Sequence, residues 1–135
     1  MDYSTISKGY NELYREEQIK KLNLIKDYLN VNPIDRLLDI GAGTGISTNF
    51  FKCNVIGIEP CRLLLMQGKN MIEAKAEYLP FKDKSFDIVL SLTSIHHFNL
   101  NKSIKEIKRV SRPNAKIIIS TLKKANNFKK IKKTV

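Results

Sequence analysis

Residues 37–45, with the sequence LLDIGAGTG, decide the fold of this chain. An apolar run reaches the acid Asp39, and three glycines then alternate with small residues. This order predicts a buried strand that breaks into a tight turn and opens a helix. Glycine has no Cβ, so its backbone can approach a ligand closely, and the peptide N–H groups at the helix start can face negative charge.

A second apolar run, VIGIE at residues 55–59, also ends at an acid. Glu59 stands eighteen residues after Gly41. An acid about 20 residues beyond a glycine-rich turn is placed to accept hydrogen bonds from both hydroxyls of a ribose. Glycine turn, helix, strand and acid together predict a nucleoside-binding βαβ unit.

Helical and strand patterns alternate along the rest of the chain. The expected helices cover 8–30, 44–52, 61–69 and 100–110, and the expected strands cover 36–40, 54–59, 71–76, 86–92 and 116–122. This alternation predicts an α/β fold with a Rossmann-like parallel sheet in the order 3-2-1-4-5 and helices on both faces. Ligands of such sheets bind beyond the C-terminal strand ends beside strand one, where Asp39, Glu59 and residues 91–97 converge.

Length and composition predict a single domain over residues 1–135, with 42% apolar residues to form a core. We expect an N-terminal helix or lid over 1–32, a cofactor-binding core over 33–122 and a basic tail over 123–135. No apolar run reaches transmembrane length and the N-terminus is no signal peptide, so we expect a cytoplasmic protein without a membrane partner. The spacing of the two cysteines predicts neither a disulfide nor a metal site.

The net charge of +11 is unevenly distributed, because residues 111–135 contain eight basic side chains and no acid. Such a tail attracts phosphate backbones or acidic surfaces, which makes RNA a candidate partner. The alternative is a solvated chain end that keeps the protein soluble, since only Phe128 is interleaved for base stacking.

The form Asp39-x-Gly41-x-Gly43-x-Gly45 resembles motif I of the class I S-adenosylmethionine-dependent methyltransferases, whereas dinucleotide enzymes favour G-x-G-x-x-G. Further blocks follow in order and resemble the type-11 subgroup, which includes the quinone-biosynthesis C-methyltransferases. These blocks are IEP at 58–60, AEYLPF at 76–81, SFDIV at 85–89, the HHF-containing segment 91–98 and EIKRVSRP at 106–113. The likeness covers roughly residues 36–121. Because of the glycine spacing, a NAD-binding dehydrogenase ranks last among the candidate functions.

The resemblance implies S-adenosylmethionine as cofactor. The predicted cofactor-binding residues are Tyr10, Asp39, Gly41, Ala42, Gly43, Gly45, Glu59, Pro60, Ala76, Glu77 and Ser91. The glycine turn is expected to lie against the methionine part of the cofactor, and Asp39 to orient that turn or help bind the amino group. Glu59 is expected to bind the ribose. A purely structural turn is the alternative, and for Tyr10, a candidate lid, the alternative is an ordinary helix aromatic.

The adenine side departs from the pattern of the subgroup. Relatives commonly have Gly-Asp-Ala there, with the Asp accepting from the adenine amino group, whereas residues 74–76 are Ala-Lys-Ala. Lys75 has no acceptor. The N–H of Ala76 is still available for the ring, and Glu77 is the candidate substitute acceptor.

Methyl transfer from a sulfonium is an in-line displacement, so the protein mainly has to align the acceptor. His97 is the candidate general base for a carbon or nitrogen acceptor, the alternative being a packed or hydrogen-bonded histidine. The sequence thus predicts a methyltransferase that acts on an unidentified small-molecule or RNA acceptor. The alternatives are a non-catalytic cofactor-binding or partner subunit and a basic RNA-binding module.

The class I fold usually continues into an antiparallel pair of strands beyond strand five, whereas 14 residues follow Thr121. We therefore expect the usual sixth and seventh strands to be absent and strand five to form an exposed edge. Proteins blunt such edges with charge or cover them with a partner. Lys116, Lys123 and Lys124 would blunt this edge, and a homodimer or another chain would cover it.

Overall fold

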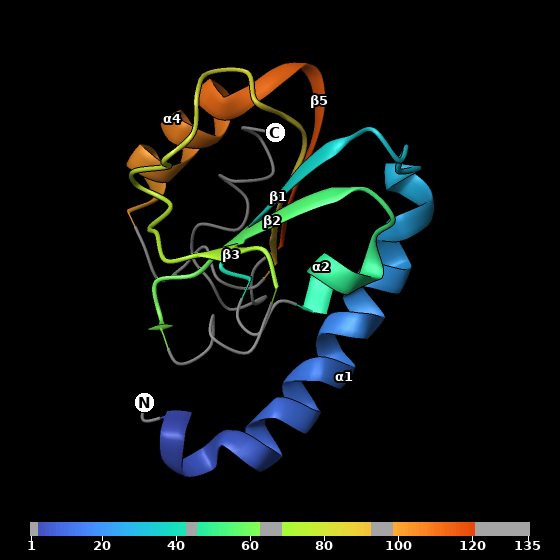
Figure 1. Ribbon diagram of the computed structural model, residues 1–135, viewed down its shortest axis with the longest axis vertical. Helices are drawn as coiled ribbons and strands as arrows, with labels where there is room; N and C mark the ends of the chain where they lie inside the picture. Colours follow the sequence, from blue (N-terminus) through green and yellow to red (C-terminus); the bar gives the residue numbers. More distant parts are fainter. Residues whose placement is uncertain (1–2, 43–45, 63–68, 93–98, 121–135) are drawn as a thin grey trace.

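The computed structural model describes residues 3–42, 46–62, 69–92 and 99–120, and a parallel sheet forms its centre (Figure 1). The sheet has five strands in the order β3-β2-β1-β4-β5, and every neighbouring pair is parallel. The strands are β1 (Arg36–Ile40), β2 (Asn54–Ile58), β3 (Met71–Ile72), β4 (Phe86–Leu92) and β5 (Ser111–Ser120). The predicted α/β fold and strand order are confirmed.

Helices cover both faces of the sheet (Figure 1). The helices are α1 (Tyr3–Leu29), α2 (Ile46–Phe50) and α4 (Leu100–Val110). Because successive side chains of a strand point to opposite faces, the sheet contributes to two cores. Leu37 and Leu90 pack with Leu22 of α1, whereas Leu38 and Val89 pack in the cluster that includes Ile107 of α4.

The ends of α1 and α4 follow local chemistry. Asn30 adopts φ 44° directly after α1, and its N–H donates to the carbonyl of Lys26 at 3.1 Å, which is a left-handed helix end. At the start of α4, the side chain of Asn99 accepts a hydrogen bond from the N–H of Lys102 at 3.0 Å. The helix predicted at 61–69 lies mostly outside the described residues.

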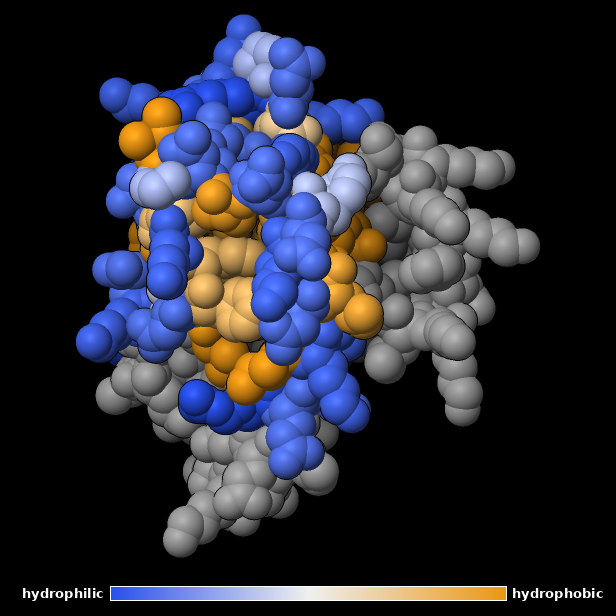
Figure 2. Space-filling model, turned by 90° about the vertical axis from the view of Figure 1, so that its right-hand side faces the viewer, coloured by the Kyte–Doolittle hydropathy of each residue, from blue (hydrophilic) through white to orange (hydrophobic). Residues whose placement is uncertain are grey.

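The outer surface of α1 is mostly hydrophilic. Figure 2 looks onto the side of the molecule where α1 lies in Figure 1, and it shows apolar patches separated by hydrophilic side chains. Leu22 and Leu29 are buried, whereas Leu24 and Tyr28 are exposed. The helix is therefore amphipathic and closes the core on its face of the sheet. No helix among the described residues is both long and apolar enough to cross a membrane.

Two strands differ from the prediction. The strand expected at 71–76 is only Met71–Ile72, because the chain beyond it turns at Lys75, whose carbonyl accepts from the N–H of Tyr78 at 3.1 Å. β5 begins earlier than expected, since Ser111 already pairs with Phe86. Regular pairing of β5 resumes only at Lys116, so the turn predicted at 112–114 is present as an irregularity within the strand.

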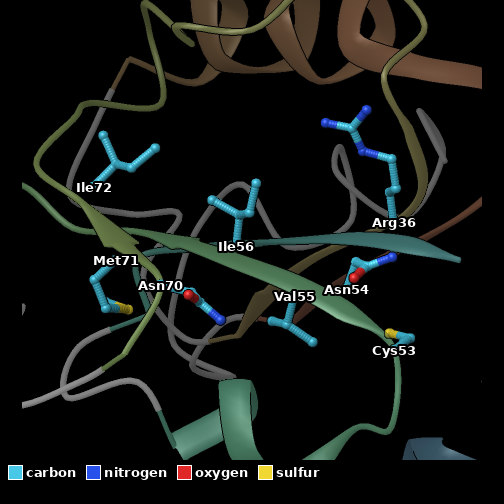
Figure 3. A pocket seen from close by; sticks show the side chains of 8 residues that line it. All are labelled: Arg36, Cys53, Asn54, Val55, Ile56, Asn70, Met71 and Ile72. Carbon is cyan, nitrogen blue, oxygen red and sulfur yellow. The ribbon is translucent and has the colours of Figure 1, made fainter. Parts of the chain in front are cut away.

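The short β3 leaves a hollow along the outer edge of β2. This hollow has a volume of about 670 Å³, and the residues around it come from the starts of β1, β2 and β3 (Figure 3). Ile56 and Ile72 point to one side of the sheet there, and Val55 and Met71 point to the other (Figure 3). None of its lining residues is a predicted cofactor ligand. The hollow is therefore separate from the site that the sequence predicts.

Lys116 joins the far edge of the sheet to the N-terminal helix. Its Nζ donates to the carbonyl of Leu29 at 2.6 Å, at the C-terminal end of α1. A cation in this position also interacts favourably with the helix dipole. Among the described residues, β4 is the only strand that pairs with β5, and residues 121–135, which include the predicted basic tail, lie outside the described part.

We expect Lys116→Met to lower the free energy of unfolding by about 1.5–3 kcal/mol, because it removes a charge-assisted hydrogen bond to Leu29. Urea unfolding followed by circular dichroism measures this loss. Lys26→Met is the matched control, since Lys26 is an exposed cation in the same last turn of α1. Equal losses in the two variants would contradict the anchoring role of Lys116.

Candidate functional site at the carboxyl ends of the strands

The turn after β1 folds over the end of β2. Gly41 has φ 70°, a conformation that favours glycine, and this directs the chain out of the strand. The N–H groups of Gly41 and Ala42 both donate to the carbonyl of Ile58 at 2.9 Å. These two N–H groups therefore fix the turn to β2, and any contact with a ligand at these residues would use other atoms. Gly43 and Gly45 lie outside the described residues.

Close packing under this turn requires glycine at position 57. A Cβ on Gly57 would lie 2.8 Å from the Cβ of Ala42 and 2.6 Å from the Sδ of Met71. The turn, β2 and β3 thus approach one another more closely than any larger side chain allows. Gly57 was not among the predicted site residues, although a glycine inside an apolar strand run indicates such a close approach.

Asp39 is a buried acid directly before the turn. The hydroxyl of Ser47 in α2 donates to Oδ2 of Asp39. Burial raises the pKa of Asp39 to about 7; the Ser47 hydrogen bond opposes this shift and the nearby charge of Glu59 adds to it. Ser47 was not among the predicted site residues, although a serine early in the helix after a glycine turn can reach back to an acid at the strand end.

Glu59 directly follows β2, whereas Asp39 is the last but one residue of the neighbouring β1, and Glu59 is also buried. Its Oε2 accepts a hydrogen bond from the N–H of Cys61 at 2.8 Å, and its own N–H donates to the carbonyl of Ile72 at 3.0 Å. Because Ile40 pairs with Ile58, Asp39 and Glu59 lie near the same ends of neighbouring strands, and the charge of Glu59 adds to the raised pKa of Asp39. Pro60, the next residue, is exposed.

Ser91 lies near the end of β4, opposite Ile40 at the end of β1. Its side chain is fully buried, and its Oγ has no hydrogen-bond partner among the residues that the structure describes. Buried hydroxyl groups are nearly always paired, so this one requires an explanation. The position of Ser91 beside the end of β1 places this unpaired hydroxyl below the strand ends, at the edge of the sheet where Asp39 and Glu59 lie.

The loop after β3 forms another wall near the strand ends. Ala76 is buried in the core cluster that also contains Ile40 and Ile58, the last residues of β1 and β2. Glu77 is half-buried, and its Oε2 accepts from the N–H of Asn99 at 3.3 Å, while Lys75 is exposed. The carboxylate of Glu77 is thus bound to the start of α4.

The described part of the chain brings most of the predicted residues to one end of the sheet. Asp39, the turn at 41–42, Glu59 and Ser91 all lie at the carboxyl ends of β1, β2 and β4, the edge at which open α/β sheets bind ligands. The side chain of Tyr10, in α1, is outside the described part, and so is His97. The predicted roles of these two residues stay predictions.

The chain is similar in sequence to several known proteins. Residues 38–119 match the model of a methyltransferase domain family. The uncharacterized protein MJ1252 of Methanocaldococcus jannaschii is 30% identical, over 96% of this chain and 58% of its own length. The demethylmenaquinone methyltransferase of Renibacterium salmoninarum is 30% identical, over 72% of this chain and 45% of its own length.

A solved structure is similar in fold as well as in sequence. The YcgJ protein of Bacillus subtilis aligns with a TM-score of 0.69 and 27% identity, over 73% of this chain and 48% of its own. The chain spans between 48% and 60% of the length of three similar curated relatives, all from Methanocaldococcus jannaschii.

The raised pKa of Asp39 predicts a pH-dependent stability. Between about pH 4 and pH 7, the folded protein retains a proton that the unfolded chain releases, so stability falls as the pH rises through this window and levels off above it. Asparagine does not titrate, so we expect the Asp39→Asn variant not to lose stability in this window. The difference in free energy of unfolding, variant minus wild type, should therefore increase by about 4 kcal/mol from about pH 4 to pH 7.

Urea unfolding at several pH values measures this difference. Asp27→Asn is the control, because Asp27 is an exposed acid on α1, and this variant should follow the wild-type curve. If the stability curves of Asp39→Asn and wild type run parallel from about pH 4 to pH 8, the pKa shift assigned to Asp39 is wrong.

Proposed function

Because the chain belongs to the methyltransferase domain family, we propose that it transfers a methyl group from S-adenosylmethionine to a small-molecule or RNA acceptor. The single observation that carries this proposal is the pair of buried acids, Asp39 and Glu59, on neighbouring strand ends. Burying two like charges together is unfavourable in an otherwise apolar core. A ligand with hydroxyl and ammonium donors offsets that cost.

The residues present fit S-adenosylmethionine. The two oxygens of the Glu59 carboxylate suit the two ribose hydroxyls, and Asp39 suits the amino group of the methionine part. When bound, the cofactor supplies an activated methyl group.

The remaining task of the protein is to position the acceptor and exclude water. His97 is our candidate base for an acceptor that must lose a proton. A small-molecule acceptor is supported by the 30% identity to a demethylmenaquinone methyltransferase. An RNA acceptor is supported by the excess of basic residues beyond residue 111.

A non-catalytic partner subunit is the second candidate function. It is favoured by the exposed Lys75 at the position where an adenine acceptor is expected, and by Glu77, whose carboxylate is bound to the N–H of Asn99. Ile117, Ile118 and Ile119 of β5 are only half-buried, so a second copy or another chain at this edge would cover apolar surface.

Calorimetric titration with S-adenosylmethionine and S-adenosylhomocysteine separates the two functions. We expect the wild type to bind both and Glu59→Gln to bind each about 1.5–3 kcal/mol more weakly, the range for a hydrogen bond to a charged group. This loss corresponds to an increase of roughly 10- to 150-fold in Kd.

Glu73→Gln is the matched control, because Glu73 is an exposed acid next to β3 and its side chain is 54% exposed. This variant should bind like wild type. No heat from the wild type at millimolar ligand would refute cofactor binding and favour the partner subunit. Equal affinities of Glu59→Gln and wild type would refute the role of Glu59.

A further inference from the structure

Glu106 and Arg109 form a two-residue clasp on the last turns of α4. The Nε of Arg109 donates to Oε2 of Glu106 at 2.6 Å, and Nη2 donates to Oε1 at 3.1 Å. The two side chains are only 19% and 32% exposed, respectively. The hydrogen bonds from Arg109 are the largest cause of the lowered pKa of Glu106, and the same bonds raise the pKa of Arg109, so both groups are charged at neutral pH.

The clasp binds the loop between β3 and β4 through its main chain. Arg109 donates from Nη2 to the carbonyl of Leu79 at 2.9 Å and from Nη1 to the carbonyl of Phe81 at 2.7 Å. Glu106 accepts from the N–H of Leu79 at 2.8 Å. Both polar main-chain groups of Leu79 are therefore bound by the same pair of side chains. A further ion pair, from Arg109 to Asp83 at 2.8 Å, fixes the end of the loop.

The loop that the clasp binds lies against the strand ends of the candidate site. Ala76 and Leu79 are both buried in the cluster that contains Ile40 and Ile58, the last residues of β1 and β2. Main-chain bonds at 79 and 81 thus limit where the preceding residues lie relative to Asp39 and Glu59. Fixing a binding element in advance raises affinity, because less order has to be imposed when the ligand binds.

A second ion pair of similar kind marks the opposite end of the sheet. Arg112 donates to both oxygens of Asp87, at 2.9 and 3.1 Å, and Asp87 also accepts from the N–H of Arg36 at 2.9 Å. Arg36 and Asp87 lie at the starts of β1 and β4. We expect loss of this ion pair to lower the stability of the fold about as much as loss of the clasp. The pair lies at the starts of the strands, away from the strand ends that hold Asp39.

We propose that Glu106 and Arg109 are positioning residues for the cofactor, which hold the 76–81 loop against the carboxyl ends of the strands and thereby set the affinity for the adenosyl group. This role rests on the proposed function. The clasp acts through the loop main chain. It therefore differs from Glu59, which is proposed to contact the cofactor itself.

Arg109→Met tests the proposal, with Arg112→Met as the matched control. The free energy of unfolding and the Kd for S-adenosylmethionine are measured at a temperature at which each variant is fully folded. We expect both variants to lose stability, but only Arg109→Met to raise the Kd, by about tenfold. Arg112→Met should remain within about twofold of wild type. Arg109→Lys should restore part of the affinity, because an ammonium group can make some of the same bonds.

The outcomes separate this role from a merely structural one. A fall in the stability of Arg109→Met with a wild-type Kd would overturn the positioning role, because lost stability alone leaves the Kd of a fully folded protein unchanged. If Arg109→Met does not fold, Glu106→Gln replaces it: this variant keeps an acceptor for the N–H of Leu79 but removes the carboxylate that orients Arg109, and its Kd is expected to rise in the same direction. Failure of the wild type to bind would instead overturn the proposed function.

Discussion

Two carboxylates buried at the ends of adjacent strands are the constraint on which the rest of this structure depends. The parallel pairing of β1 and β2 places the ends of both strands side by side, and this brings Asp39 and Glu59 close together. Burial, and to a lesser extent the charge of Glu59, raises the pKa of Asp39, so ionising Asp39 in the free protein is unfavourable. Such a cost is typical of functional sites, and the surrounding packing has to offset it.

The neighbouring elements each contribute to this arrangement. Glycine at 57 lets the turn after β1 lie directly against β2, and the carbonyl of Ile58 fixes that turn through two hydrogen bonds. Ser47 stabilises the ionised form of Asp39 from α2. From the other face, the clasp of Glu106 and Arg109 connects α4 to the loop that borders the same strand ends. The site is thus assembled from both layers of the domain.

Local patterns in the sequence were sufficient for much of this account. The apolar runs predicted β1 and β4 at their observed bounds, and the glycine motif identified Asp39 and Glu59 as neighbours. The length of β3 was predicted wrongly, because the chain beyond Ile72 leaves the sheet and turns at Lys75, a turn that no apolar run reveals. The partners of Arg109 in the loop between β3 and β4 lie 26 to 30 residues away in the chain, so no local pattern reveals them. The burial of the unpaired Ser91 hydroxyl likewise depends on the packing of β4 between β1 and β5, which no local pattern reveals.

The most direct measurement is a crystal structure of the protein grown with S-adenosylhomocysteine. We predict that both ribose hydroxyls lie within hydrogen-bonding distance of Glu59 and that the homocysteine part lies over the turn after β1, near Asp39. It also predicts that the hollow beside β2 is free of the ligand. Ligand density in that hollow, or a blocked cleft between the ends of β1 and β4, would contradict the account.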